Sequence, residues 1–220
     1  MPILSKRKLY SNVAAYAPAP GAPAAYTFRG QLAADPSNDI LTGNVDIGTA
    51  SADRLIVALC ATSGAPFTLA SMIVNGVTLT IDKTQTNSHG VAICSGLVTS
   101  GTGSVTVSMT FTGSAFQDKF CVLYALTGLN SNLVKQVAGA SVPSVTIPVV
   151  AGDFLFAIGV DAANPSFSGS TQSPTTQRQQ TGTGSAYHET SADWVIASTN
   201  ASFSIASSPA ANLIAAATYR

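Results

Sequence analysis

The segment Ser104-Val105-Thr106-Val107-Ser108-Met109-Thr110-Phe111 is the clearest indication of the fold class, because polar and apolar residues alternate along it without a break. A period of two places successive side chains on opposite faces, which is the pattern of a β-strand with one buried face and one wet face. The turn residues Gly101-Thr102-Gly103 precede it. This segment therefore predicts an antiparallel sheet that packs against the rest of the protein through one face.

Working outward from it, longer apolar runs predict strands inside such sheets. Residues 55–61 form an apolar run after the charged pair Asp53-Arg54, which is typical of a buried strand with a polar start. Residues 119–126 and 154–160 are nearly continuous apolar runs and predict central strands. Further strands are expected at residues 90–98, 194–198, 202–206 and 213–218.

Two features predict where a turn and a sheet edge lie. Asn75-Gly76 stands between two short runs rich in β-branched residues, and this pair accepts the positive φ angles of a type I′ hairpin turn. Residues 142–150 contain Pro143 and Pro148. Because proline cannot donate a hydrogen bond to a neighbouring strand, this run is expected at an edge.

The whole pattern predicts an all-β protein, an antiparallel β-sandwich or jelly-roll-like domain over residues 25–220. Residues 210–217 are the best helical candidate, but the run is short and a closing strand is the preferred interpretation. Residues 166–184 are dominated by Ser, Thr, Gln and Gly and predict a long exposed loop, either a tolerated insertion or a contact loop. No strong internal repeat is evident beyond short Gly-Thr-Gly echoes.

Residues 1–24 differ from the rest and predict an extended N-terminal arm. Alternating Ala and Pro between residues 14 and 23 favour polyproline II, which has no internal hydrogen bonds. The arm is either a floppy terminus or a docking segment that meets an acidic partner through its basic cluster and apolar anchors. The residues expected to bind that partner are Lys6, Arg7, Lys8, Tyr10, Tyr16 and Tyr26.

Composition excludes several classes of protein. Charged residues make up 9% of the chain, against about 25% in an average soluble domain, and ten basic residues balance ten acidic ones. A nucleic-acid-binding protein needs a surplus of Lys and Arg, so nucleic acid is not an expected partner. No apolar run approaches the ~20 residues of a membrane-spanning helix. Prolines follow the basic cluster where a signal peptide would be apolar, so synthesis in the cytoplasm without export is expected.

The residues offer little recognisable chemistry. The Gly-x-Ser-x-Gly and phosphate-binding loop motifs are absent, and neither a metal nor a cofactor is expected. His188, Glu189 and Asp193 could form a metal or acid–base group, although a polar strand end explains them as well. Asp53, Asp153 and Asp193 each precede an apolar run and fit strand starts. Cys60, Cys94 and Cys121 are expected to be buried thiols, with a disulfide as the alternative.

Four turn-and-strand segments carry a resemblance to a known group of proteins. They are Ser51-Ala52-Asp53-Arg54-Leu55-Ile56-Val57-Ala58, Ile73-Val74-Asn75-Gly76-Val77, Val98-Thr99-Ser100-Gly101-Thr102-Gly103-Ser104-Val105-Thr106-Val107 and Tyr124-Ala125-Leu126-Thr127-Gly128-Leu129. Over residues 40–160 the chain resembles the β-sandwich virion proteins of tailed bacteriophages. The resemblance implies a head-decoration, collar, fibre or tail component and supplies no catalytic residues.

The residues and the resemblance together predict a non-enzymatic structural protein of a bacteriophage virion that forms a homo-oligomer or binds capsid, portal, collar or tail proteins. Small, uncharged side chains create little repulsion and lose little entropy at an interface. One alternative is a carbohydrate-binding or adhesin module that recognises a host-surface glycan through exposed aromatic residues such as Trp194 or Tyr187. A hydrolase with an unrecognised site is the other alternative.

Overall fold

The computed structural model describes residues 24–34, 39–63, 67–113, 118–129, 134–141, 144–161, 166–181, 188–208 and 213–220. Within these ranges the chain forms seventeen β-strands and no helix, so the all-β prediction is confirmed. No helix in this part of the chain could cross a membrane. The predicted arm at residues 1–24 lies outside the described residues except for Ala24.

The strands form four antiparallel sheets, two inner and two outer. The first inner sheet has the order β1 (Ala25–Ala34), β9 (Lys119–Thr127), β3 (Leu55–Thr62), β7 (Gly90–Leu97) and β6 (Thr80–Thr86). The first outer sheet has the order β2 (Ile40–Asp46), β8 (Ser104–Gly113), β4 (Phe67–Val74) and β5 (Val77–Thr78). The second inner sheet has the order β10 (Val134–Ala140), β17 (Leu213–Tyr219), β12 (Phe154–Asp161), β15 (His188–Val195) and β14 (Thr176–Thr181). The second outer sheet has the order β11 (Ser144–Val149), β16 (Asn200–Ser208) and β13 (Ser166–Gly169).

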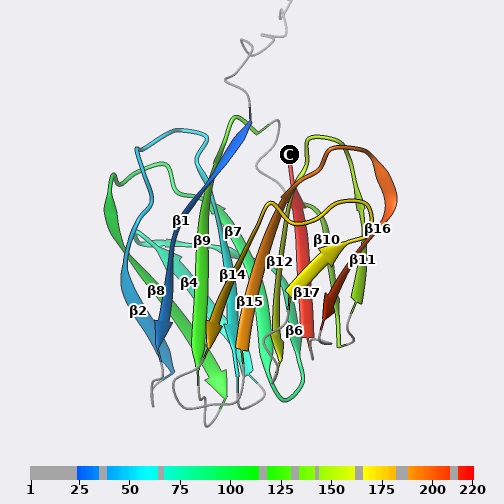
Figure 1. Cartoon of the computed structure of the whole chain (residues 1–220). Helices are drawn as coiled ribbons and strands as arrows, with labels where there is room; N and C mark the ends of the chain where they lie inside the picture. The colour runs from blue at the N-terminus through cyan, green and yellow to red at the C-terminus, as the bar shows by residue number, and fades with distance from the viewer. Residues whose placement is uncertain are drawn as a thin grey trace, which may run out of the picture.

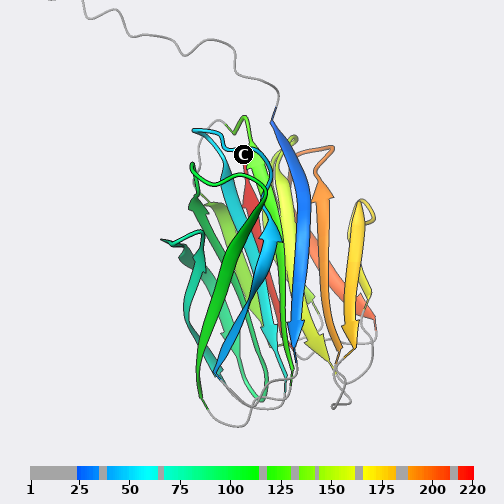
Figure 2. The same ribbon diagram turned by 90° about the vertical axis from the view of Figure 1, so that its left-hand side faces the viewer.

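The four sheets are stacked as layers, which Figure 1 shows from the first outer sheet on the left to the second outer sheet on the right. Figure 2 looks onto the first outer sheet, with the other layers behind it. Three apolar cores separate the layers. Ile56 and Met72 belong to the core between the first outer and first inner sheets. Val57 and Phe156 belong to the central core between the two inner sheets. Trp194 and Phe203 belong to the core between the second inner and second outer sheets. The predicted sandwich is therefore present twice, back to back.

The two sandwiches repeat one topology. The order β1-β9-β3-β7-β6 in the first inner sheet becomes β10-β17-β12-β15-β14 in the second, and β2-β8-β4 becomes β11-β16-β13. The counterparts also occur in the same order along the chain in the two halves. The chain is therefore a structural duplication. The sequence did not predict it, because no strong internal repeat is evident there.

Backbone hydrogen bonds fix which residues are equivalent. Before β3, Arg54 N donates to Ser51 O (3.3 Å) and Arg54 O accepts from Val98 N (3.1 Å). Before β12, Asp153 N donates to Val150 O (2.9 Å) and Asp153 O accepts from Ile196 N (2.9 Å). Arg54 and Asp153 thus occupy the same place in the two halves.

Several sequence predictions are confirmed at the level of single elements. Asn75 and Gly76 have φ angles of 50° and 78°, as a type I′ turn between β4 and β5 requires. The proline-containing run forms β11 at the edge of its sheet, and its register shifts between Ile147 and Val149, around Pro148. Residues 213–219 form a strand, β17, which lies inside its sheet between β10 and β12.

The predicted loop at residues 166–184 is wrong for most of its length, because it contains β13 and β14. Both are edge strands, which can be polar since only one side pairs with the sheet. The Gln177 side chain joins them, accepting from Phe167 N (2.6 Å) and donating to Phe167 O (3.0 Å). Residues 182–184 lie outside the described part.

The three cysteines are free and fully buried, so the prediction of buried thiols is confirmed. All three belong to the core of the first sandwich. Cys60 and Cys121 are direct cross-strand partners with their Sγ atoms 4.0 Å apart. The neighbouring thiols of Cys121 and Cys94, and next burial, raise the pKa of Cys60, which keeps it protonated and unreactive at neutral pH.

Candidate functional site

Of the six residues predicted to bind a partner, only Tyr26 lies in the described part of the chain. Lys6, Arg7, Lys8, Tyr10 and Tyr16 fall outside it. Tyr26 lies near the start of β1, half-buried, and its ring packs against Phe154 and Phe156 at centroid distances of 5.1 and 5.7 Å. Its partner-binding role stays a prediction, and the structure adds an internal role that joins the two halves.

Asp193 is the centre of the polar cluster that includes Tyr26. Tyr26 donates to Asp193 Oδ1 (2.6 Å), and Tyr124 donates to Asp193 Oδ2 (2.9 Å). Arg178 forms an ion pair with Oδ2 at 2.8 Å. Asp193 lies near the C-terminal end of β15 with no exposed surface, so its assignment to a strand start is wrong. Its contacts connect β1 and β9 of the first half to β14 and β15 of the second.

Arg178 covers this cluster from the edge of the second inner sheet. Its guanidinium lies 3.9 Å from the ring centroid of Phe28 and 5.4 Å from that of Tyr124, both within cation–π range. Burial, followed by the hydrogen bond to Asp193, raises the pKa of Tyr26 to about 12. Both the charge pairing and the protonated hydroxyl groups favour a structural role for this cluster over proton transfer at neutral pH.

A second polar contact connects the halves on the other side of the central core. Tyr219 on β17 donates to Asp82 Oδ2 on β6 at 2.8 Å. Asp82 lies on the edge strand β6, and Asp193 lies on β15, next to the edge strand β14. Each half therefore supplies a carboxylate that accepts a hydrogen bond from a tyrosine of the other half. These paired contacts explain how the inner sheets keep one alignment despite a mostly apolar interface.

Glu189 is a buried acid on β15, four residues before Asp193 and on the same face of the strand. It has no exposed surface, and neither carboxylate oxygen has a hydrogen-bond partner. Burial, and next the negative charge of Asp118, raise the pKa of Glu189 to about 8. The side chain of Ser63 donates to Asp118 Oδ2 (3.3 Å). Glu189 is therefore protonated at neutral pH and does not act as a general base there.

The predicted alternative of a metal or acid–base group at His188, Glu189 and Asp193 is not supported. Successive residues of a strand face opposite sides, so His188 points away from the face that carries Glu189 and Asp193. Within the described ranges, no three His, Cys, Asp or Glu side chains are placed to hold a metal ion.

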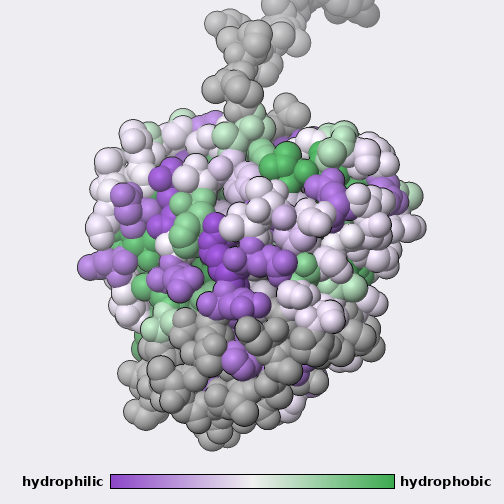
Figure 3. Space-filling view, viewed as in Figure 1, coloured by the Kyte–Doolittle hydropathy of each residue, from purple (hydrophilic) through white to green (hydrophobic). Residues whose placement is uncertain are grey.

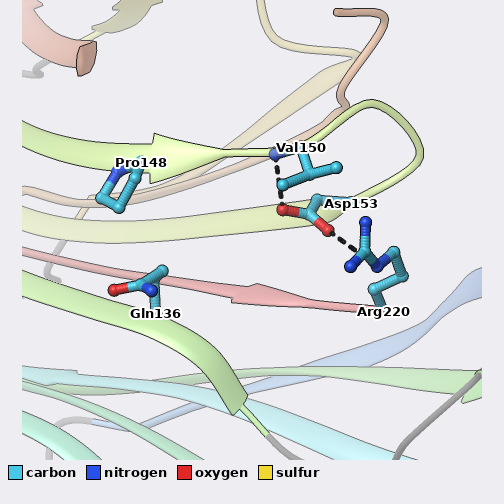
Figure 4. A pocket seen from close by; sticks show the side chains of 5 residues that line it. All are labelled: Gln136, Pro148, Val150, Asp153 and Arg220. Carbon is cyan, nitrogen blue, oxygen red and sulfur yellow. Dashed lines mark hydrogen bonds and ion pairs between the residues drawn. The ribbon is translucent and has the colours of Figure 1, made fainter. Parts of the chain in front are cut away.

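A pocket of about 210 Å³ lies at the end of the second sandwich where β12 begins and β17 ends. Figure 4 shows its lining from β10, β11, the turn before β12 and the end of β17. Asp153 Oδ2 accepts from Val150 N (2.8 Å), and Asp153 Oδ1 lies 3.8 Å from Arg220 Nε. The lining residues are Gln136, Pro148, Val150, Asp153 and Arg220.

At the chain position equivalent to Asp153, the first sandwich has Arg54. Its guanidinium donates to six backbone carbonyl oxygens, and its side chain is 1% exposed. The acceptors are Ile47 O (3.4 Å), Gly48 O (3.0 Å), Thr49 O (2.9 Å), Val98 O (2.8 Å), Ser100 O (2.6 Å) and Gly101 O (3.0 Å). The first half thus uses an arginine to hold two loops together, where the second half has a short turn and an open pocket.

Sequence reasoning missed this pocket and the Asp193 cluster. Arg54, as a lone cation at the start of an apolar run, was a usable signal of burial, but nothing in one sequence pairs Asp153 with Arg220. Trp194, which the carbohydrate-binding alternative would need on the surface, is fully buried against Phe203 at 6.3 Å between ring centroids. Tyr187 lies outside the described residues.

No family model, curated protein or solved structure matches the chain.

Proposed function

We propose that this chain is a non-enzymatic structural component of a tailed-bacteriophage particle, serving as a head-decoration, collar, fibre or tail protein. Its partners would be other virion proteins and further copies of itself, bound through the N-terminal arm and through neutral β surfaces. The chain would be made in the host cytoplasm and act in the virion.

The observation that carries this proposal is where the few charged side chains lie. Of the fifteen charged residues whose burial is described, seven are buried and six are half-buried. Only Asp39 and Asp46 are exposed. Because repulsion between surface charges keeps soluble proteins apart, a surface with so little charge favours close packing against copies or a larger shell.

The strands of the outer sheets supply surfaces with little charge on both sides of the stack, since Asp46 at the end of β2 is the one exposed charged side chain described on them. On the first, Thr42 contacts Ser108 (3.3 Å) across β2 and β8. On the second, Thr146 contacts Ser204 (3.0 Å) across β11 and β16. Figure 3 shows the layers edge-on, and hydrophilic residues gather near the middle of that face, away from the outer sheets. Hydroxyl groups that already form hydrogen bonds with each other lose little free energy when a neighbouring molecule covers them.

The stacked sheets also suit a protein that must keep its shape inside a particle. Four layers share three cores, and tyrosine–carboxylate contacts lock the central interface on both sides. A part that must keep its shape in a particle benefits from such continuous packing.

Deleting residues 1–24 and measuring incorporation into particles tests the proposal. Particles purified by density gradient should contain the full-length chain and lack the truncated chain, while both chains show the same β-sheet circular dichroism. A matched control replaces Ala14, Ala15 and Ala17 with Ser, which keeps the prolines, the tyrosines and the basic cluster and should leave incorporation unchanged. Absence of the full-length chain from purified particles would refute the proposal, and normal incorporation of the truncated chain would refute the role of the arm.

A further inference from the structure

The pocket beside Asp153 lies in the second of the two duplicated halves. In the first half, Arg54 occupies the equivalent place and its guanidinium is saturated by backbone carbonyls. The connection from the outer sheet to the inner sheet is shorter in the second half. It runs from Ile47 to Arg54 in the first half and from Val149 to Asp153 in the second. The shorter turn and shorter side chain leave the second place open.

The pocket contains an acceptor that the protein itself does not satisfy. Asp153 is 2% exposed, and its Oδ1 has no hydrogen-bond partner. The nearest cation, Arg220 Nε, is 3.8 Å away, which is beyond hydrogen-bond distance. A group that donates to Oδ1 and accepts from Arg220 can bridge this gap, and a hydroxyl group does both.

The charges of the pocket select against an ionic ligand. Asp153 and Arg220 cancel each other, so a lone cation or anion would pair with one of them and repel the other. Gln136 adds an amide that both donates and accepts. Pro148 and the partly exposed Val150 add an apolar wall. Mixed donors and acceptors beside an apolar wall match a neutral ring that carries several hydroxyl groups.

We propose that this pocket binds a single neutral sugar ring, one hydroxyl of which bridges Asp153 Oδ1 and Arg220 while the ring's C–H face packs on Pro148 and Val150. The pocket volume of about 210 Å³ leaves room for one small ring beside these groups. The ligand is thus a terminal or side-branch residue of a neutral glycan. This inference does not depend on the proposed function.

Titration of the ¹⁵N-labelled full-length chain tests the proposal. The probes are the methyl glycosides of glucose, galactose, mannose and N-acetylglucosamine, with acetate and methylammonium as ionic probes. At least one glycoside should shift the amide signals of Gly152 and Asp153 and the Nε signal of Arg220, saturating with a Kd on the order of millimolar.

Two variants and a matched control make the result specific. Arg220→Ala and Gln136→Ala remove polar groups that line the pocket, and Arg220→Ala should weaken binding by about tenfold or more. Thr127→Ala changes the equivalent position at the end of β9 in the first half and should leave the Kd within about twofold. Asp153 is left intact because its Oδ2 holds the turn.

Three outcomes would overturn the proposal. These are the absence of any saturable shift with every glycoside, a Kd that Arg220→Ala does not change, and tighter binding of acetate or methylammonium than of every glycoside. The unchanged spectrum of each variant outside the pocket shows that the fold is retained, so loss of binding cannot be attributed to unfolding.

Discussion

At the scale of single residues, the two halves differ most where a charged side chain is buried. Arg54 donates to six carbonyl oxygens of two loops, of which Gly48 O also accepts from Gly103 N. A buried charge is tolerated only with such a full set of partners. The loss of solvation lowers the pKa of Arg54, but a guanidinium stays protonated in proteins.

Replacing Arg54 with Met should therefore be strongly destabilising. Six carbonyl groups would lose the hydrogen bond from the guanidinium, of which Gly48 O keeps a second donor in Gly103 N, so we expect the free energy of unfolding to fall by about 3–5 kcal/mol. Denaturation with urea measures the change. Lys83→Met, which removes a half-buried cation from edge strand β6, is the control and should cost less than about 1 kcal/mol. Equal effects of the two substitutions would contradict the role of Arg54.

Glu189 predicts a pH dependence of stability. Its pKa is about 8 in the folded chain and near 4.3 when unfolded, so the folded state holds the proton more tightly. The contribution of protonated Glu189 to the free energy of unfolding is intact below about pH 4. It is lost as the pH rises from there through 8, by about 1.4 kcal/mol for each pH unit between the two pKa values. Glu189→Gln should remove this loss, so the variant should exceed the wild type in stability at pH 8 and match it near pH 4.

Urea denaturation of both proteins across this range measures the difference. Asp46→Asn, at an exposed position of β2, is the control for loss of one negative charge. A wild type whose stability advantage over Glu189→Gln grows with pH would show that the sign of this argument is wrong.

At the scale of elements, the period-two pattern was sufficient for most strands. Residues 104–111, 119–126 and 154–160 form β8, β9 and β12 as predicted, because alternation or continuous apolarity reports burial directly. β14 could not be predicted in this way. It is an edge strand whose Gln177 bonds to the backbone of β13, and a polar edge strand has the composition of a loop.

The hairpin between β4 and β5 gives a prediction at this scale. Gly76 has a φ of 78°, and a Cβ added there would meet no atom within 4 Å. Gly76→Ala should therefore cost about 1–2 kcal/mol through backbone conformation alone. Thermal unfolding measures it, with the exposed Thr78→Ala as the control. A cost no greater than that of the control would show that the turn relaxes to another type.

At the scale of the whole molecule, the duplication was hidden from the sequence because equivalent positions carry different chemistry. Arg54 corresponds to Asp153. Val91 corresponds to Glu189, because Val91 pairs with Ala61 in the first half as Glu189 pairs with Val160 in the second. Loops of different length break the spacing further. Topology and hydrogen bonding were retained while side chains diverged, and a single sequence does not report topology.

The shared central core predicts that neither half is stable alone. A fragment of residues 134–220 would expose the apolar face formed by residues such as Phe156, Ile158 and Leu213, which the first inner sheet covers in the full chain. We expect this fragment to aggregate or to bind the dye ANS strongly, in contrast to the full chain. A soluble fragment with a sharp thermal transition would show that the halves are independent domains.

Sedimentation velocity over a wide range of concentrations tests most directly whether the outer surfaces pack against copies or a shell. We expect the full-length chain to associate as its concentration rises. Thr106→Lys combined with Ser204→Lys, which adds charge to both outer sheets, should abolish association without loss of β structure, whereas Thr106→Ser should not. A full-length chain that stays monomeric at every concentration and does not bind purified virions would contradict the account.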